Sequence, residues 1–266
     1  VMPALFALAR SAFQRQFAYR AANLAGLITN LFFGLLRAAV VIALFDARGG
    51  APVAGYGLRE SVTFMGVAQA LIGWVALWGW WDLLRSVKTG EIANDLQRPV
   101  DFFWYWAAQD FGRAISQLLM RGIPLLLAFG FAYPIVWPAD AGQTALLGIS
   151  LGLAWFGSFA WRFMFSLVAF WTTDAMGVAR IAIFVQMFLA GFFLPITFFP
   201  DGVGGIIRLL PFAGMVNTPI EIFVNVARGP DALAAVALQT FWAAALYLGA
   251  RLVLAAGIRR LTILGG

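Results

Sequence analysis

Six apolar runs, each long enough to cross a bilayer, constrain this chain more than any other feature of its sequence. They cover residues 24–45, 62–83, 114–137, 144–171, 178–198 and 232–256. A helix needs about 20 apolar residues to span roughly 30 Å of hydrocarbon, and its backbone has to satisfy its own hydrogen bonds there. Because only 11% of the residues are charged, we predict an all-α integral membrane protein that forms one domain over residues 1–266.

Positive charge predicts how these spans are oriented, because Lys and Arg collect in loops on the cytoplasmic side of a membrane. Both chain ends and one set of loops carry Arg10, Arg15, Arg20, Arg85, Lys88, Arg98, Arg113, Arg180, Arg251, Arg259 and Arg260. The opposite loops carry only Arg48, Arg59, Arg208 and Arg228. We therefore expect a multi-pass protein of the plasma (inner) membrane with both termini in the cytoplasm. The scattered arginines do not form the clustered basic face that nucleic-acid binding needs.

The residues before the first span predict an amphipathic helix. Phe6, Phe13 and Phe17 fall on one helical face, while Arg10 and Arg20 lie away from it. A helix with this pattern lies in the membrane interface, with its aromatic face toward the lipid.

Residues 86–101 are the one strongly polar segment between two spans. Helix formation is expected near residues 90–99, for about two turns, because Pro99 disfavours helical geometry in the residue before it. The polar side chains that project from this helix are Glu91, Asn94, Asp95 and Arg98. The aromatic run 102–106 that follows is expected to lie at the headgroup level. A short polar helix on one side of a bilayer is typical of a docking element, although a solvated loop is the alternative.

Residues 199–226 are apolar but contain several Pro and Gly residues, which forbid a continuous helix. We expect two short helices, at residues 203–210 and 218–226, that re-enter the outer leaflet between the fifth and sixth spans.

The sequence offers little for catalysis. It contains no Cys and no His, and its single lysine, Lys88, lacks the Gly-rich framework of a phosphate loop. All acidic residues are expected in loops or at span ends, which disfavours an ion-gradient-driven secondary transporter or a small channel. We infer a chain that moves a compound without supplying the energy. A secondary transporter or channel, a scaffold and a lipid-processing enzyme remain alternatives.

Three arginines, Arg37, Arg121 and Arg162, fall inside spans. In one interpretation these arginines line a translocation path or a contact between subunits. In the other they only stabilise the fold. The second interpretation is favoured because no embedded acid is expected beside them. The residues predicted to line a path are Phe33, Met65, Gln69, Phe188 and Phe192. Ordinary helix packing is the alternative for each.

Two motifs resemble the permeases of ABC type-2 exporters. Residues 90–100, GEIANDLQRPV, resemble the cytoplasmic segment of that family, except that Asp101 follows where relatives often carry a small polar residue. Residues 191–195 (GFFLP), 199–200 (FP), 210–212 (LPF) and 219–223 (PIEIF) resemble its later signature. The order of spans and elements is similar over nearly the whole chain.

The resemblance implies a twelve-helix core made by two permeases, with a second copy or a paralogue as partner, and ABC ATPase subunits below. It makes the polar segment a coupling helix, in which Glu91, Asn94, Asp95 and Arg98 face an ATPase groove. The N-terminal helix becomes a second ATPase contact, and the re-entrant helices cap the outer side of the path. ATP and Mg²⁺ are expected on the ATPase, with no cofactor on this chain. Lipids surround the assembly.

Overall fold

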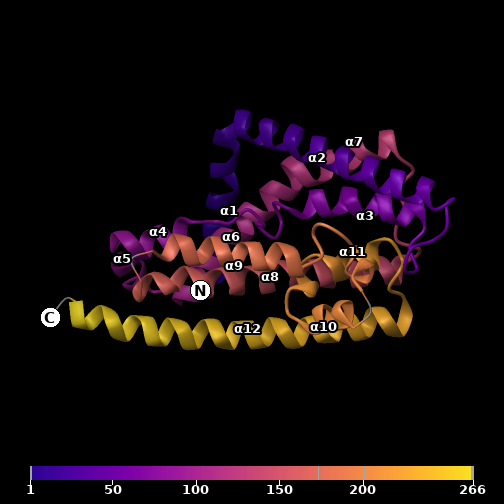
Figure 1. Ribbon diagram of the computed structural model, residues 1–266. Helices are drawn as coiled ribbons and strands as arrows, with labels where there is room; N and C mark the ends of the chain where they lie inside the picture. The colour runs from indigo at the N-terminus through magenta and orange to yellow at the C-terminus, as the bar shows by residue number, and fades with distance from the viewer. Residues whose placement is uncertain (1, 173, 201, 265–266) are drawn as a thin grey trace.

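The computed structural model describes residues 2–172, 174–200 and 202–264, with side chains up to residue 260. These residues form helices joined by turns, which confirms the predicted all-α class. The long helix α8 (Ala141–Leu167) packs against both α9 (Ala175–Leu189) and α12 (Gly229–Leu264). In Figure 1 a second group, made by α2 (Arg20–Ala47), α3 (Leu58–Leu71) and α7 (Ile123–Ala132), covers one side of this layer.

Among the described residues, four helical stretches are long and apolar enough to cross a membrane. They are Met2–Ala47, Phe102–Ala132, Ala141–Phe170 and Gly229–Arg260. These stretches contain the first and sixth predicted spans, all but the last residue of the fourth, and residues 114–132 of the third, which was predicted to continue to residue 137. The second and fifth predicted spans lie on shorter helices, so the six-span layout stays a prediction.

The second span was predicted as a continuous helix over residues 62–83, and this is wrong. Helix α3 ends at Leu71, residues 72–78 form turns, residues 79–81 are irregular, and α4 (Asp82–Thr89) follows. Left-handed backbone at Gly79 (φ 87°) and Ala76 (φ 49°) interrupts the helix. The carbonyls that the break frees are bonded by other helices: Gly73 O accepts from Arg113 Nη1 at 2.7 Å.

The fifth span was predicted over residues 178–198, but α9 ends at Leu189. Gly191 has a φ of 75°, and a Cβ built there would lie 3.0 Å from the Asn217 side chain. That side chain is fixed, because Asn217 Oδ1 accepts a hydrogen bond from the Ile196 amide at 3.0 Å. The close approach of Asn217 and the glycine geometry together turn the chain after α9.

The two short helices expected after the fifth span are present. They are α10 (Val203–Leu209) and α11 (Asn217–Phe223). Residue 201, within the predicted re-entrant segment, lies outside the described residues. Figure 1 shows α10 and α11 at one end of the bundle, whereas α4 and α5 (Ile92–Leu96) lie at the other end with the C-terminal part of α12.

Four residues of the aromatic run 102–106 are buried within the chain, whereas Trp104 is 40% exposed, and the predicted location at the headgroup level stays a prediction. The run forms the start of α6 (Phe102–Gln117), and Asp101 Oδ1 caps this helix by accepting from the Phe103 amide at 3.1 Å. Phe103 is fully buried, with ring centroids 5.2 Å from Phe159 and 5.0 Å from Phe163. The run therefore joins α6 to α8.

The predicted N-terminal helix is present as α1 (Met2–Gln16), and a short turn at Phe17–Tyr19 separates it from α2. Helix α1 packs along α6 at very close range, because a Cβ added to Gly112 would lie 2.0 Å from the Ala9 carbonyl oxygen. Helix α6 continues through one turn of π-helix, Leu118–Gly122, into α7. The interfacial location of α1 stays a prediction.

Candidate functional site

The predicted docking segment is present, but its helix is shorter than expected. Gly90 has a φ of 79° and closes α4 instead of opening the next helix, so α5 covers only Ile92–Leu96. Ile92 is fully buried and anchors the segment to the bundle. Glu91 and Asn94 are exposed, so their side chains are free to meet a partner.

The remaining two predicted docking residues contact each other. Arg98 Nε lies 3.1 Å from Asp95 Oδ1, and the Arg98 guanidinium lies 4.9 Å from the centroid of the Tyr105 ring. Exposed pairs of this kind contribute little to stability, about 0.5 kcal/mol or less. Asp95 and Arg98 are therefore held in place yet remain accessible, since half of the Arg98 side chain is exposed.

A cavity of about 410 Å³ lies beside this segment and is bordered by α1, α4, α5 and α6. Three buried polar atoms on its walls have no hydrogen-bond partner: Ser86 Oγ, Trp106 Nε1 and Gln109 Nε2. Buried polar groups normally form hydrogen bonds, so these three atoms lack bonds that a folded protein usually provides. Arg15 Nη2 donates to Gln109 Oε1 at 3.0 Å, which ties α1 to the same cavity. No pattern in the sequence predicted these three buried atoms, because their burial depends on the packing of four helices.

A second group of charges lies deeper in the bundle and corrects two predictions. Asp110, expected at a span end, is fully buried on α6. Its Oδ2 lies 2.8 Å from Arg162 Nη2, and its Oδ1 lies 2.8 Å from Arg113 Nε. Trp155 Nε1 also donates to Asp110 Oδ2, at 2.9 Å. Arg162 thus has an embedded acidic partner, contrary to the expectation that none exists.

This buried cluster fixes the broken second span. Besides the bond from Arg113 to Gly73 O, Ser158 Oγ donates to Val75 O at 2.5 Å. Ser158 Oγ in turn accepts from Gln186 Nε2 of α9 at 3.0 Å. One network therefore connects α6, α8 and α9 to residues 72–81, the stretch that leads directly into α4 and the docking segment.

The other two embedded arginines also have partners within the chain. Arg37 Nη1 donates to Phe192 O at 2.9 Å, and its guanidinium lies 4.2 Å from the centroid of the Phe192 ring. Arg121 Nη2 donates to Ala22 O at 2.9 Å. These contacts join α2 to the turn after α9 and to the π-helical turn after α6, as the structural interpretation expects.

The five predicted path residues are distributed over α2, α3, α9 and the turn after α9. Phe33 on α2 and Phe188 on α9 are about half exposed, whereas Met65, Gln69 and Phe192 are buried in this chain. The contacts within a single chain do not show whether these residues line a path between subunits, so this assignment stays a prediction.

A second buried acid, Glu221, lies on α11, in the place of the short helix predicted at residues 218–226. Its Oε1 accepts from Tyr56 Oη at 3.2 Å and forms an ion pair with Arg208 of α10. Burial raises the pKa of the Glu221 carboxyl and of the Tyr56 hydroxyl above their ordinary values. The i, i+3 spacing of Asp110 and Arg113 was a sequence signal for the first cluster. No such signal exists here, because Tyr56 and Glu221 are far apart in the chain.

These features define a multi-pass membrane protein with a polar segment at one end of a bundle of apolar helices. A family model described as ABC-2 family transporter protein matches residues 33–265. The chain belongs to this family, whose members are the membrane components of transporters and associate with an ABC ATPase. Comparisons with curated proteins and with solved structures give no match.

Proposed function

We propose that this chain is the permease subunit of an ATP-driven exporter that moves a hydrophobic or amphipathic compound out of the cytoplasm. It lies in the plasma (inner) membrane with both termini in the cytoplasm, beside a second permease that is an identical copy or a paralogue. ATP and Mg²⁺ bind to the partner ATPase. The family match supports the permease role, and the positive charge of the loops supports the orientation.

The observation that carries this proposal is the docking segment, whose exposed polar side chains lie beside a cavity. Glu91, Asn94 and Arg98 are exposed beside a cavity whose walls leave three buried polar atoms without partners. An interface with a second protein would bury these exposed polar and charged side chains. The cavity is shared by α1 and α5, so one ATPase surface contacts both helices.

The structure also suggests how force from the ATPase reaches the spans. Residues 72–81 follow α3 and lead into α4, and the Asp110 cluster bonds two carbonyls of this stretch to α6 and α8. A displacement of α5 and α4 would therefore move α6 and α8 with them, since buried ion pairs resist separation.

The path between subunits is assigned to Phe33, Met65, Gln69, Phe188 and Phe192.

The test is co-purification of the ATPase with the tagged chain. Reversing the charge of two docking residues, Glu91→Arg with Asp95→Arg, should reduce the recovered ATPase at least about tenfold, or roughly 1.4 kcal/mol. The matched control is Asp46→Arg, at the end of α2, which should leave recovery unchanged. Full recovery with the double variant would show that Glu91 and Asp95 do not dock the ATPase. Transport that continues without any ATPase would instead favour an ion-gradient-driven transporter or channel.

A further inference from the structure

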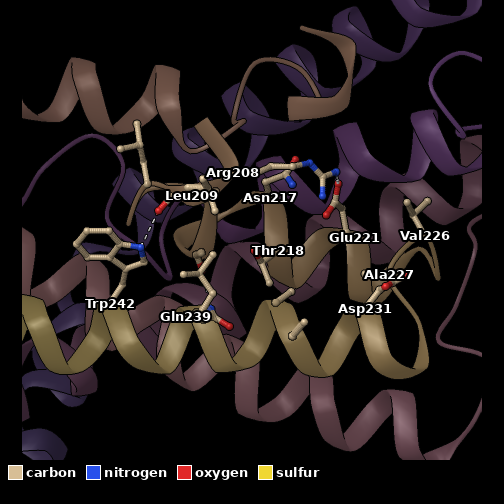
Figure 2. Close-up of a pocket in the computed structure, with 16 residues that line it drawn as sticks. Arg208, Leu209, Asn217, Thr218, Glu221, Val226, Ala227, Asp231, Gln239 and Trp242 are labelled. Carbon is tan, nitrogen blue, oxygen red and sulfur yellow. Dashed lines mark hydrogen bonds and ion pairs between the residues drawn. The ribbon is translucent and has the colours of Figure 1, made fainter. Parts of the chain in front are cut away.

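A cavity of about 380 Å³ lies between α10, α11 and α12, at the opposite end of the bundle from α5 (Figure 2). Its volume falls within the range of about 300–1,000 Å³ that is typical of small-molecule sites. It shares no lining residue with the cavity beside the docking segment. The family assignment gives this cavity no role.

One end of the cavity is polar and carries a net negative charge. Figure 2 shows Glu221 and Asp231 at this end, with the Arg208 guanidinium pointing toward Glu221. Arg208 balances the charge of Glu221, since the two form an ion pair. Asp231 has no ion pair within the described part of the chain, so one carboxylate remains uncompensated. Glu221 is only 3% exposed, which makes this a built site rather than a surface cluster.

The other end of the cavity is apolar and aromatic. Trp242 lines it together with Leu209 and Leu238, and Trp242 Nε1 donates to Leu209 O at 2.8 Å, which fixes the indole ring. Asp231 and Trp242 both lie on α12, about three turns apart, or roughly 16 Å along the helix. Small side chains, Ala234 and Ala235, line the part of this stretch nearer to Asp231, and the larger Leu238 and Gln239 line the part nearer to Trp242.

The cavity is held open by a buried amide. Gln239 Nε2 donates to Gly214 O at 2.6 Å and to Ser150 O at 2.8 Å, while Gln239 Oε1 accepts from Ser150 Oγ at 2.9 Å. These bonds fix α12 against α8 and against the turn between α10 and α11. The walls are therefore positioned before any ligand arrives, which lowers the cost of binding.

We propose that this cavity binds an amphipathic amine, with its ammonium group between Asp231 and Glu221 and its apolar tail along α12 toward Trp242. The uncompensated carboxylate favours a cation and repels an anion. The separation of roughly 16 Å between the polar and aromatic ends selects a ligand that carries charge and apolar surface at opposite ends. That such an amine is also the exported compound rests on the proposed function; binding itself does not.

The experiment measures binding to the full chain in lipid nanodiscs. The probe is tritiated phenyloctylamine, followed by scintillation proximity, with empty nanodiscs subtracted. Phenyloctanol and phenyloctanoate, which have similar tails, serve as competitors. We expect saturable binding of the amine, about tenfold weaker competition by the alcohol, and no competition by the carboxylate. Equal competition by all three compounds, or no saturable binding, would overturn the proposal.

Variants locate the site. Asp231→Asn should weaken amine binding about tenfold, and Ala235→Leu should abolish it by filling the space along α12. Glu221→Gln should also weaken binding, but it disturbs a buried pair, so Asp231→Asn and Ala235→Leu decide the outcome. The matched control is Asp46→Asn, an exposed acid outside the cavity, which should bind the amine like the native chain. Unchanged binding with both Asp231→Asn and Ala235→Leu would place the amine elsewhere.

This experiment separates the two proposals because it needs no ATPase. If an ATPase co-purifies and depends on Glu91 and Asp95, but the amine does not bind, the cavity assignment fails and the permease assignment stands. If the amine binds and depends on Asp231, but no ATPase is recovered, the permease assignment fails instead.

Discussion

Two carboxylates, Asp110 and Glu221, are buried in the described part of the chain; both pair with arginine, yet their surroundings differ. The side chain of Asp110 is fully buried, and its partner Arg162 is 1% exposed. The side chain of Glu221 is 4% exposed, but its partner Arg208 is 42% exposed and both line a cavity. We call the first group, Asp110 with Arg113 and Arg162, the closed cluster. We call the second, Glu221 with Tyr56 and Arg208, the open cluster.

The comparison separates two uses of buried charge. The side chains of the closed cluster are at most 11% exposed, and their bonds join α6 to α8 and to the stretch that leads into the docking segment. The open cluster presents one face to a cavity, so water or a ligand is able to reach its charges. Burial of a charge alone therefore does not mark a binding site. The exposure of its charged partner distinguishes a cluster that a ligand can reach from one that it cannot.

The largest expected effect breaks the closed cluster. Asp110→Asn leaves Arg113 and Arg162 buried without a carboxylate, which should cost about 3–5 kcal/mol in the free energy of unfolding. Denaturant titration of the purified chain in a mild detergent would measure this loss. The control Asp46→Asn removes an exposed acid and should change stability by less than about 0.5 kcal/mol.

A companion variant sharpens this result. Replacing Asp110, Arg113 and Arg162 together by leucine or methionine removes every charge of the closed cluster. It should restore much of the stability that Asp110→Asn loses, because an apolar core of similar volume can replace a buried ion pair. A loss of less than about 1 kcal/mol for Asp110→Asn alone would show that the cluster is not closed.

A smaller effect is expected when the open cluster loses its acid. Glu221→Gln removes the ion pair, but half-exposed Arg208 is able to turn toward water, so the expected cost is only about 1–2 kcal/mol. The same denaturant titration measures it. A cost as large as that of Asp110→Asn would abolish the distinction between the two clusters.

The sequence predicted the broad fold but not either cluster. The apolar runs identified most of the long helices, and the Pro and Gly pattern identified α10 and α11. Asp110 was misplaced because the third span was predicted to begin only at residue 114, whereas α6 begins at Phe102 and its aromatic residues pack against α8. Its partner Arg162 lies on a different helix, and only tertiary packing brings the two together. Likewise, the break after Leu71 depends on side chains of α6 and α8 that bond its carbonyls.

The smallest expected effect concerns pH and distinguishes the clusters without a change in packing. Burial raises the pKa of Glu221 above its ordinary value of 4.5. The folded chain therefore keeps this proton to a higher pH than the unfolded chain does. The resulting stability is fully present below 4.5 and is lost as the pH rises through the folded pKa.

We therefore expect the native chain to lose stability between about pH 4.5 and pH 8 relative to Glu221→Gln, which has no proton to lose at this position. Denaturant titrations of both proteins at the two pH values measure the difference. Asp231→Asn is the matched control, because it changes a carboxylate of the same cavity that is exposed; it should keep the native pH dependence. Identical pH dependence of the native chain and Glu221→Gln would contradict this expectation. It would mean that Arg208 and water hold Glu221 ionised. The open cluster would then be more accessible to solvent than its burial indicates.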